Sequence, residues 1–121
     1  MFSVTGDPRH RSTVTMTFPP DRRSVFVGSA FSGQKILWLV GPSYHGPVLI
    51  RGIGPHNTMP VRFSTTDGPL RPEVRLPPEP AAGPARYTDT YVRVRRPGCY
   101  AWQVDGSTFT YTITFRVVAG S

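Results

Sequence analysis

The sequence is poor in cysteine, lysine and acidic residues. Its single cysteine, Cys99, has no partner in the chain, so no intramolecular disulfide can form. Lys35 is the only lysine, and arginine supplies the rest of the 14 basic residues against seven acidic ones. No run of about 20 apolar residues occurs, so we expect no membrane-spanning segment. Residues 1–10 lack the layout of a signal peptide, and no export signal is expected in this chain.

Motifs for catalysis and metal binding are also missing. The three histidines, His10, His45 and His56, show neither H-x-x-x-H spacing nor a nearby C-x-x-C pair. The sequence contains no G-x-S-x-G motif and no glycine-rich phosphate loop. Of the few acids, Asp67 and Asp105 are each followed by glycine and are explained as turn residues. We therefore expect a protein that is not an enzyme, with no catalytic residue, no metal and no cofactor.

The charge balance favours acidic partners. The formal net charge is +7 and the sequence pI is near 10.5. Arginine is well suited to bidentate contacts with carboxylate, phosphate or sulfate. An arginine-, proline- and glycine-rich composition is also what a GC-rich genome encodes, and that explanation needs no ligand.

Apolar residues alternate with polar ones throughout, as in β-strands. Between 108 and 118, Phe109, Tyr111, Ile113, Phe115 and Val117 alternate with threonines and Arg116. Residues 99–104 and 87–95 show the same period, and Asp105-Gly106 is expected to form the turn between the last two strands. Further strands are expected over 14–18, 24–27, 48–51, 61–64 and 73–76, and residues 36–40 indicate a strand covered on both faces. These patterns predict an all-β, antiparallel sandwich of about seven to nine strands, with little helix.

The length predicts one domain over residues 1–121. The proline-rich stretch 77–86 resembles a linker, but the residues after it are too few to fold alone, so we expect a surface loop that crosses between sheets. Residues 1–23 are expected to form an N-terminal arm or strand.

Two stretches, 35–52 (KILWLVGPSYHGPVLIRG) and 97–109 (PGCYAWQVDGSTF), resemble a poorly characterised family of bacterial extracytoplasmic domains. These domains occur in lipoproteins and surface proteins and have an immunoglobulin-like sandwich fold. The resemblance covers roughly residues 35–118, and Pro97-Gly98-Cys99-Tyr100 is its most recognisable element. It implies a location outside the cytoplasm, at the cell surface, and transfers no catalytic residue.

Four residues are predicted to form the structural core of the sandwich. Tyr100 follows a turn into the penultimate strand, where a tyrosine hydroxyl often ties a corner to the sheet. Trp102 lies on the same face and is expected to pack with Trp38 between the sheets, in place of the disulfide of antibody-type domains. Cys99 is expected to be a buried small apolar side chain rather than a reactive thiol.

Candidate binding residues lie on one strand face and in one loop. Tyr91, Arg93 and Arg95 share the outward face of a strand, with Arg96 at the following turn. Such a face could bind an anionic polymer, although outward arginines also keep a strand soluble and prevent aggregation. Tyr44 and His45 lie in a loop bracketed by Gly-Pro pairs, which indicates either a binding tip or a simple turn.

The sequence thus favours a binding or interaction module at the cell envelope, with an unknown protein or an anionic cell-surface polymer as its partner. A second hypothesis is a structural subunit, in which the N-terminal arm adds a strand to a neighbouring copy and forms a homo-oligomer. A third hypothesis is a basic binder of glycan or nucleic acid, which predicts binding that weakens steeply with salt.

Overall fold

A computed structural model describes residues 2–3, 15–20, 22–56, 59–66, 68–78 and 86–119. Nine strands lie in these ranges and no helix does, so none of the described residues belongs to a helix that could cross a membrane. The strands are β1 (Phe2–Ser3), β2 (Thr15–Phe18), β3 (Ser32–Val40), β4 (Val48–Ile53), β5 (Arg62–Ser64), β6 (Glu73–Leu76), β7 (Arg86–Val94), β8 (Gly98–Gly106) and β9 (Thr110–Ala119).

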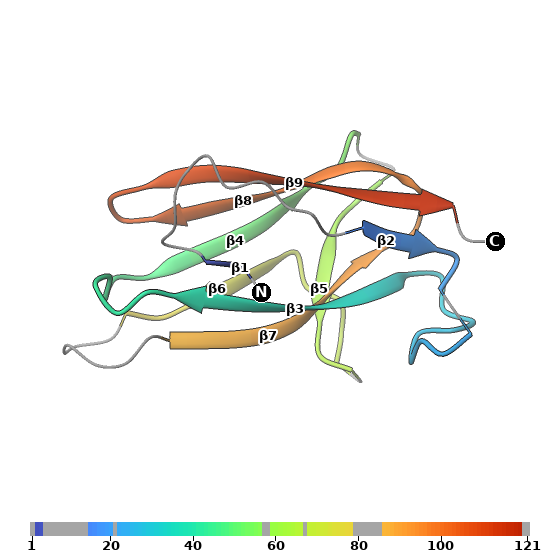
Figure 1. Ribbon diagram of the computed structural model, residues 1–121, viewed down its shortest axis with the longest axis horizontal. Coiled ribbons are helices and arrows are strands. Elements are labelled where there is room, and N and C mark those ends of the chain that lie inside the picture. Colours follow the sequence, from blue (N-terminus) through green and yellow to red (C-terminus); the bar gives the residue numbers. More distant parts are fainter. Residues whose placement is uncertain are drawn as a thin grey trace.

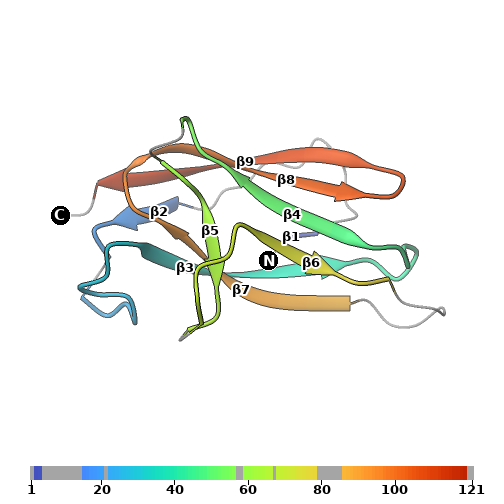
Figure 2. The ribbon, with the colours of Figure 1, turned by 180° about the vertical axis from the view of Figure 1, so that it is seen from behind.

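The strands form two sheets that face each other (Figures 1 and 2). One sheet has the order β1-β3-β7-β5, and the other has the order β2-β9-β8-β4-β6. Neighbouring strands are antiparallel except at two edges, where β1 is parallel to β3 and β2 is parallel to β9. The pairing of β3 with β7 opposite a β9-β8-β4 sheet is that of an immunoglobulin-like sandwich, so the predicted fold class is confirmed.

The hairpin of β8 and β9 shows most clearly how the sequence determines the structure. Along β9, alternate residues from Tyr111 to Val117 are buried and the residues between them are exposed, as the pattern predicts. The predicted turn is displaced by two residues. Asp105 and Gly106 still belong to β8, and the Gly106 amide donates to the carbonyl of Phe109 at 2.8 Å, so Ser107 and Thr108 occupy the turn.

Two tryptophans join the sheets at the centre of the core. Trp38 of β3 and Trp102 of β8 are fully buried, and their rings meet edge to face with centroids 5.2 Å apart. Trp102 also stacks on Phe115 of β9 at 4.1 Å. The prediction that an indole pair joins the two sheets is confirmed.

Tyr100 ties the β7–β8 corner to the sheet, also as predicted. Its ring is 2% exposed, and its hydroxyl donates to the backbone carbonyl of Arg96 at 2.7 Å, four residues upstream. The expectation for Cys99 is wrong, because this side chain is exposed. Neighbouring strand residues point to opposite faces, so the inward direction of Tyr100 sends Cys99 outward.

Two strand predictions in the N-terminal half also need correction. Residues 24–27 form turns rather than a strand, with the amide of Val27 donating to the carbonyl of Ser24 at 3.2 Å. The sequence predicts that β3 is buried on both faces, but only one of its faces is buried. Ile36, Trp38 and Val40 are buried, whereas the intervening leucines are only half-buried.

The connection between β6 and β7 leads from one sheet to the other. Most of the predicted proline-rich loop (77–86) and most of the predicted arm (1–23) lie outside the described residues. The arm's threonine-rich segment is described from Thr15 onward, as β2, and it pairs with β9 of its own chain from Thr15–Arg116 to Phe18–Ala119.

Candidate binding surface

The predicted arginine face of β7 is covered rather than open. Tyr91 and Arg93 do alternate along the outer side of β7, and Arg95 follows just beyond its end, but the loop between β2 and β3 folds over this face. Arg93 is only 7% exposed, although the sequence indicates a solvated side chain. This part of the predicted binding face is therefore wrong, because another segment of the chain occupies it.

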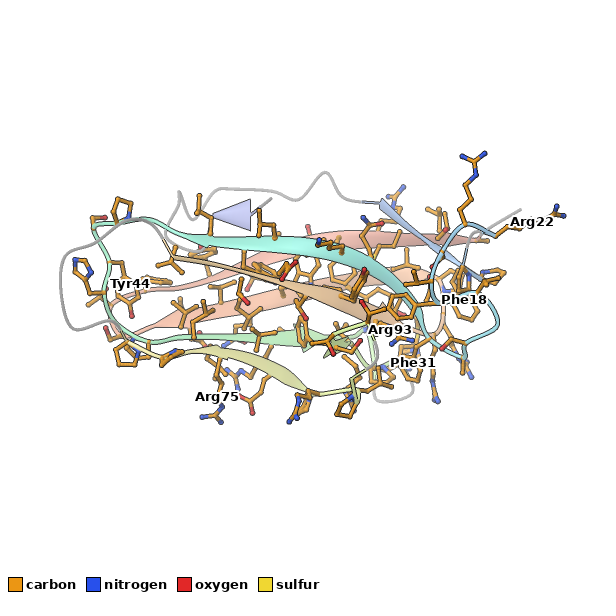
Figure 3. The ribbon with its side chains drawn as sticks, turned by 90° about the horizontal axis from the view of Figure 1, so that it is seen from below. Phe18, Arg22, Phe31, Tyr44, Arg75 and Arg93 are labelled. Carbon is orange, nitrogen blue, oxygen red and sulfur yellow. The ribbon has the colours of Figure 1, made fainter. Side chains whose placement is uncertain are left out.

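Arg93 holds the covering loop by hydrogen bonds. One terminal nitrogen donates to Ser64 Oγ at 3.2 Å, and the other donates to Ser29 Oγ at 3.0 Å and to the Phe31 carbonyl at 2.9 Å. Figure 3 shows Arg93 and Phe31 near each other. Burial lowers the pKa of Arg93 below its ordinary value through desolvation. The guanidinium is thus committed to the fold and is not available to a ligand.

Phe26 is the apolar anchor of the same loop. Its ring lies 3.7 Å from Cζ of Arg93 and meets the ring of Tyr91 edge to face at 4.9 Å. A side chain at Gly33, directly beneath, would collide with the Phe26 ring, so this position requires glycine. Phe26 is 5% exposed, and its contacts with Gly33 of β3 and with Tyr91 and Arg93 of β7 fix the loop to the sheet.

Arg95 and Arg96, at the turn after β7, remain exposed. The guanidinium of Arg95 lies 6.0 Å from the centroid of the Phe31 ring. This turn lies at the end of the sandwich where β2 and β9 finish and where the β2–β3 loop is attached (Figure 1). We call this region the arginine-rich end. It carries the exposed residues Arg22, Arg23, Arg95, Arg96 and Arg116.

The described carboxylates are neutralised elsewhere. Asp89 pairs with Lys35 at 3.2 Å, Asp105 with Arg51 at 2.9 Å, and Glu73 with Arg75 at 3.0 Å. No carboxylate of the described ranges pairs with Arg22, Arg96 or Arg116. The charges of Arg22, Arg96 and Arg116 are therefore not compensated by a described carboxylate.

The second predicted site, the loop with Tyr44 and His45, lies at the opposite end (Figure 3). The Tyr44 hydroxyl donates to the carbonyl of Pro47 at 2.6 Å and accepts from the amide of Ser107 at 2.8 Å. Its ring meets Phe109 at 5.0 Å. Tyr44 thus fastens this loop to the β8–β9 turn, and His45 beside it is half-buried. The structure does not bring this loop together with the arginine face.

A mostly apolar groove of about 460 Å³ lies beside this loop, where Pro47, Val48, Leu76 and Gly106 line it. Asp105, the one carboxylate among the described residues that line it, accepts hydrogen bonds from Gln103, Thr110 and Arg51. Their combined effect outweighs desolvation and lowers the pKa of Asp105. Within the described ranges, no three His, Cys, Asp or Glu side chains come together to hold a metal.

The sequence interpretation missed the β2–β3 loop as part of the surface. Its signal was present, since Arg22-Arg23 follows two prolines and Gly28 follows the V-F-V triplet. The segment Val25-Phe26-Val27 is predicted to be a strand, but it forms a turn. In this turn the ring of Phe26 points inward, and the side chains of Val25 and Val27 point outward. Gly28 has φ of +84°, which ends the turn in a conformation that favours glycine.

No protein-family model matches the chain, and no curated protein sequence matches it either. The chain is therefore classified by its fold alone, as an all-β sandwich.

Proposed function

We propose that the protein is a non-enzymatic binding module that engages an anionic partner through its arginine-rich end. The observation that carries the proposal is the separation of charge described above. Glu73, Asp89 and Asp105 are each paired with a cation of their own sheet. The exposed residues Arg22, Arg96 and Arg116, which pair with no described carboxylate, lie at one end of the sandwich. Uncompensated guanidinium groups attract carboxylate, sulfate or phosphate and raise the rate of encounter with them.

The scaffold suits this role because binding would need no rearrangement. The end is built from loops and turns that are attached to the sheets, through Arg93 to the β2–β3 loop and through Tyr100 to the β7–β8 corner. Charged groups presented on a fixed frame lose less conformational entropy when a ligand binds.

We further propose that the module acts outside the cytoplasm, at the cell envelope. The support is the resemblance of residues 35–118 to extracytoplasmic domains, together with the positive charge. Envelope surfaces carry anionic polymers and anionic lipids, which are partners of the required sign.

Heparin, a sulfated glycan, is the probe for the first test. Affinity is measured by titration calorimetry at several salt concentrations, for the wild type and for the triple variant Arg22→Ala, Arg96→Ala, Arg116→Ala. The control variant, Arg51→Ala with Arg75→Ala, removes cations that are already paired with carboxylates. We expect affinity to fall steeply with salt, the triple variant to lose about tenfold or more, and the control to lose less than about twofold.

Two results would overturn the proposal. One is affinity that hardly changes with salt. The other is an equal loss per removed charge in the triple variant and the control, because binding would then depend on net charge alone and not on the arginine-rich end.

A further inference from the structure

The β2–β3 loop displays two apolar side chains to solvent. Val25 and Val27 flank the buried Phe26 and are 64% and 58% exposed. The loop that carries them is closed by hydrogen bonds from Val27 N to Ser24 O and from Ser29 N to Phe26 O. A hydrogen bond from Phe26 N to Ser24 Oγ at 3.1 Å adds to these. A hydrogen-bonded turn thus holds the two valine side chains outward.

A groove of about 410 Å³ with a mixed polar and apolar lining lies next to this turn. The residues that line it include two cationic ones, Arg23 and Lys35, two that carry hydroxyl groups, Ser24 and Tyr91, and Val25. Lys35 also pairs with Asp89 at 3.2 Å, but both side chains are about 60% exposed. Such an exposed pair contributes little and can exchange partners. An ammonium, a guanidinium and hydroxyls around one groove are the groups that bind a phosphate.

From these two features we infer that the β2–β3 loop docks on an anionic lipid bilayer. A lipid phosphate occupies the groove between Arg23 and Lys35, and Val25 and Val27 enter the interface beneath the headgroups. The inference rests on the proposed function, because the arginine-rich end provides the attraction to the charged surface.

The valines distinguish a bilayer from a soluble polyanion. A hydrated glycan or nucleic acid offers exposed aliphatic side chains little apolar surface to bury. A bilayer has an apolar layer directly below its anionic surface, so it uses the arginines and the valines together.

The test is co-sedimentation with lipid vesicles at an ionic strength of about 0.15 M. One set of vesicles is phosphatidylcholine alone, and the other contains about one third phosphatidylglycerol. The loop variant is Val25→Thr with Val27→Thr, which keeps the β-branched shape and adds hydroxyls. The groove variant is Arg23→Ala with Lys35→Ala. The matched control is Leu70→Thr, because Leu70 is an aliphatic side chain of the β5–β6 connection and is 40% exposed.

We expect the wild type and the Leu70 control to bind the anionic vesicles and not the neutral ones. The loop variant should bind about tenfold or more weakly, since two partly buried valines are lost. It should keep its heparin affinity and its melting temperature, because both valines are exposed in the free protein. The groove variant should weaken vesicle binding by a similar factor.

The outcomes separate this inference from the proposed function. Heparin binding without vesicle binding overturns the lipid partner and leaves the anionic function standing, whereas loss of both overturns both. Vesicle binding that is unchanged in the loop variant refutes valine insertion. Saturable binding of glycerol 3-phosphate in solution, as tight as that of vesicles, would identify a soluble phosphate ligand and also overturn the inference.

Discussion

Tyr100→Phe tests the hydrogen bond that closes the β7–β8 corner. The phenylalanine keeps the buried ring and its stack on Phe115, so the variant loses only the bond to the Arg96 carbonyl. A hydrogen bond of this kind contributes about 0.5–1.5 kcal/mol, and water can replace the hydroxyl at the exposed Arg96. We expect the free energy of unfolding to fall by about 1 kcal/mol at pH 7, and the melting temperature to fall by roughly 3–6 °C.

The same variant changes the alkaline limit of stability. Burial raises the pKa of Tyr100 above its ordinary value of 10.0, against an opposing effect of the positive charge of Arg96. The protonated phenol is therefore favoured in the folded state, and its stabilising contribution is complete below the unfolded pKa. This contribution is lost as pH rises through the folded pKa. The difference in stability between the wild type and Tyr100→Phe should thus shrink above about pH 10.

Urea unfolding, followed by tryptophan fluorescence, measures both effects, because the two indoles are fully buried in the folded state. The control is Tyr91→Phe, whose hydroxyl has no hydrogen bond to any described residue. The reasoning is refuted if Tyr100→Phe is as stable as the wild type at pH 7, if the control loses as much, or if the difference stays constant into alkaline pH.

Three further predictions concern Cys99, Asp105 and the β2–β3 loop. Cys99→Ser should change the free energy of unfolding by less than about 0.5 kcal/mol, and the native thiol should react fully with a thiol reagent; a thiol protected until unfolding would contradict its exposure. Asp105→Asn should be less stable than the wild type at pH 7, and this difference should vanish towards about pH 2, because a lowered pKa contributes stability that is lost as pH falls. The midpoints of urea unfolding measure the difference across this range, and a constant difference would contradict the prediction. Gly33→Ala should displace Phe26, destabilise the fold by about 1–3 kcal/mol and speed trypsin cleavage at Arg22 and Arg23; unchanged cleavage would show that Phe26 does not anchor the loop.

The fold could be predicted from the sequence in those segments where apolar and polar residues alternate strictly. Tyr111, Ile113 and Phe115 alternate with threonines, and only a strand with one buried face satisfies that pattern. The tyrosine corner and the tryptophan pair followed in the same way, since Tyr100 and Trp102 lie on one face of β8. Cys99 was misjudged because its apolar and aromatic neighbours were given more weight than its place in the alternation.

The binding surface could not be predicted to the same extent, because it depends on contacts between distant segments. Alternation places Arg93 on an outer face, but it cannot show that Phe26 and Ser29 lie over that face from 64 to 67 residues away. The same packing turns Val25 and Val27 outward. Local sequence thus predicted that Arg93 lies on an outer face, and tertiary contacts decided that this face is covered.

The packing of Trp38 against Trp102 allows the two sheets to be joined without an oxidation step. Sandwiches that are fastened by a cystine depend on an oxidant to complete them, and reductants weaken them. Here dispersion and desolvation of two indoles hold the layers together, and neither depends on redox potential. The chain should therefore reach the same folded state, with the same stability, in a thiol-rich medium as in an oxidising one.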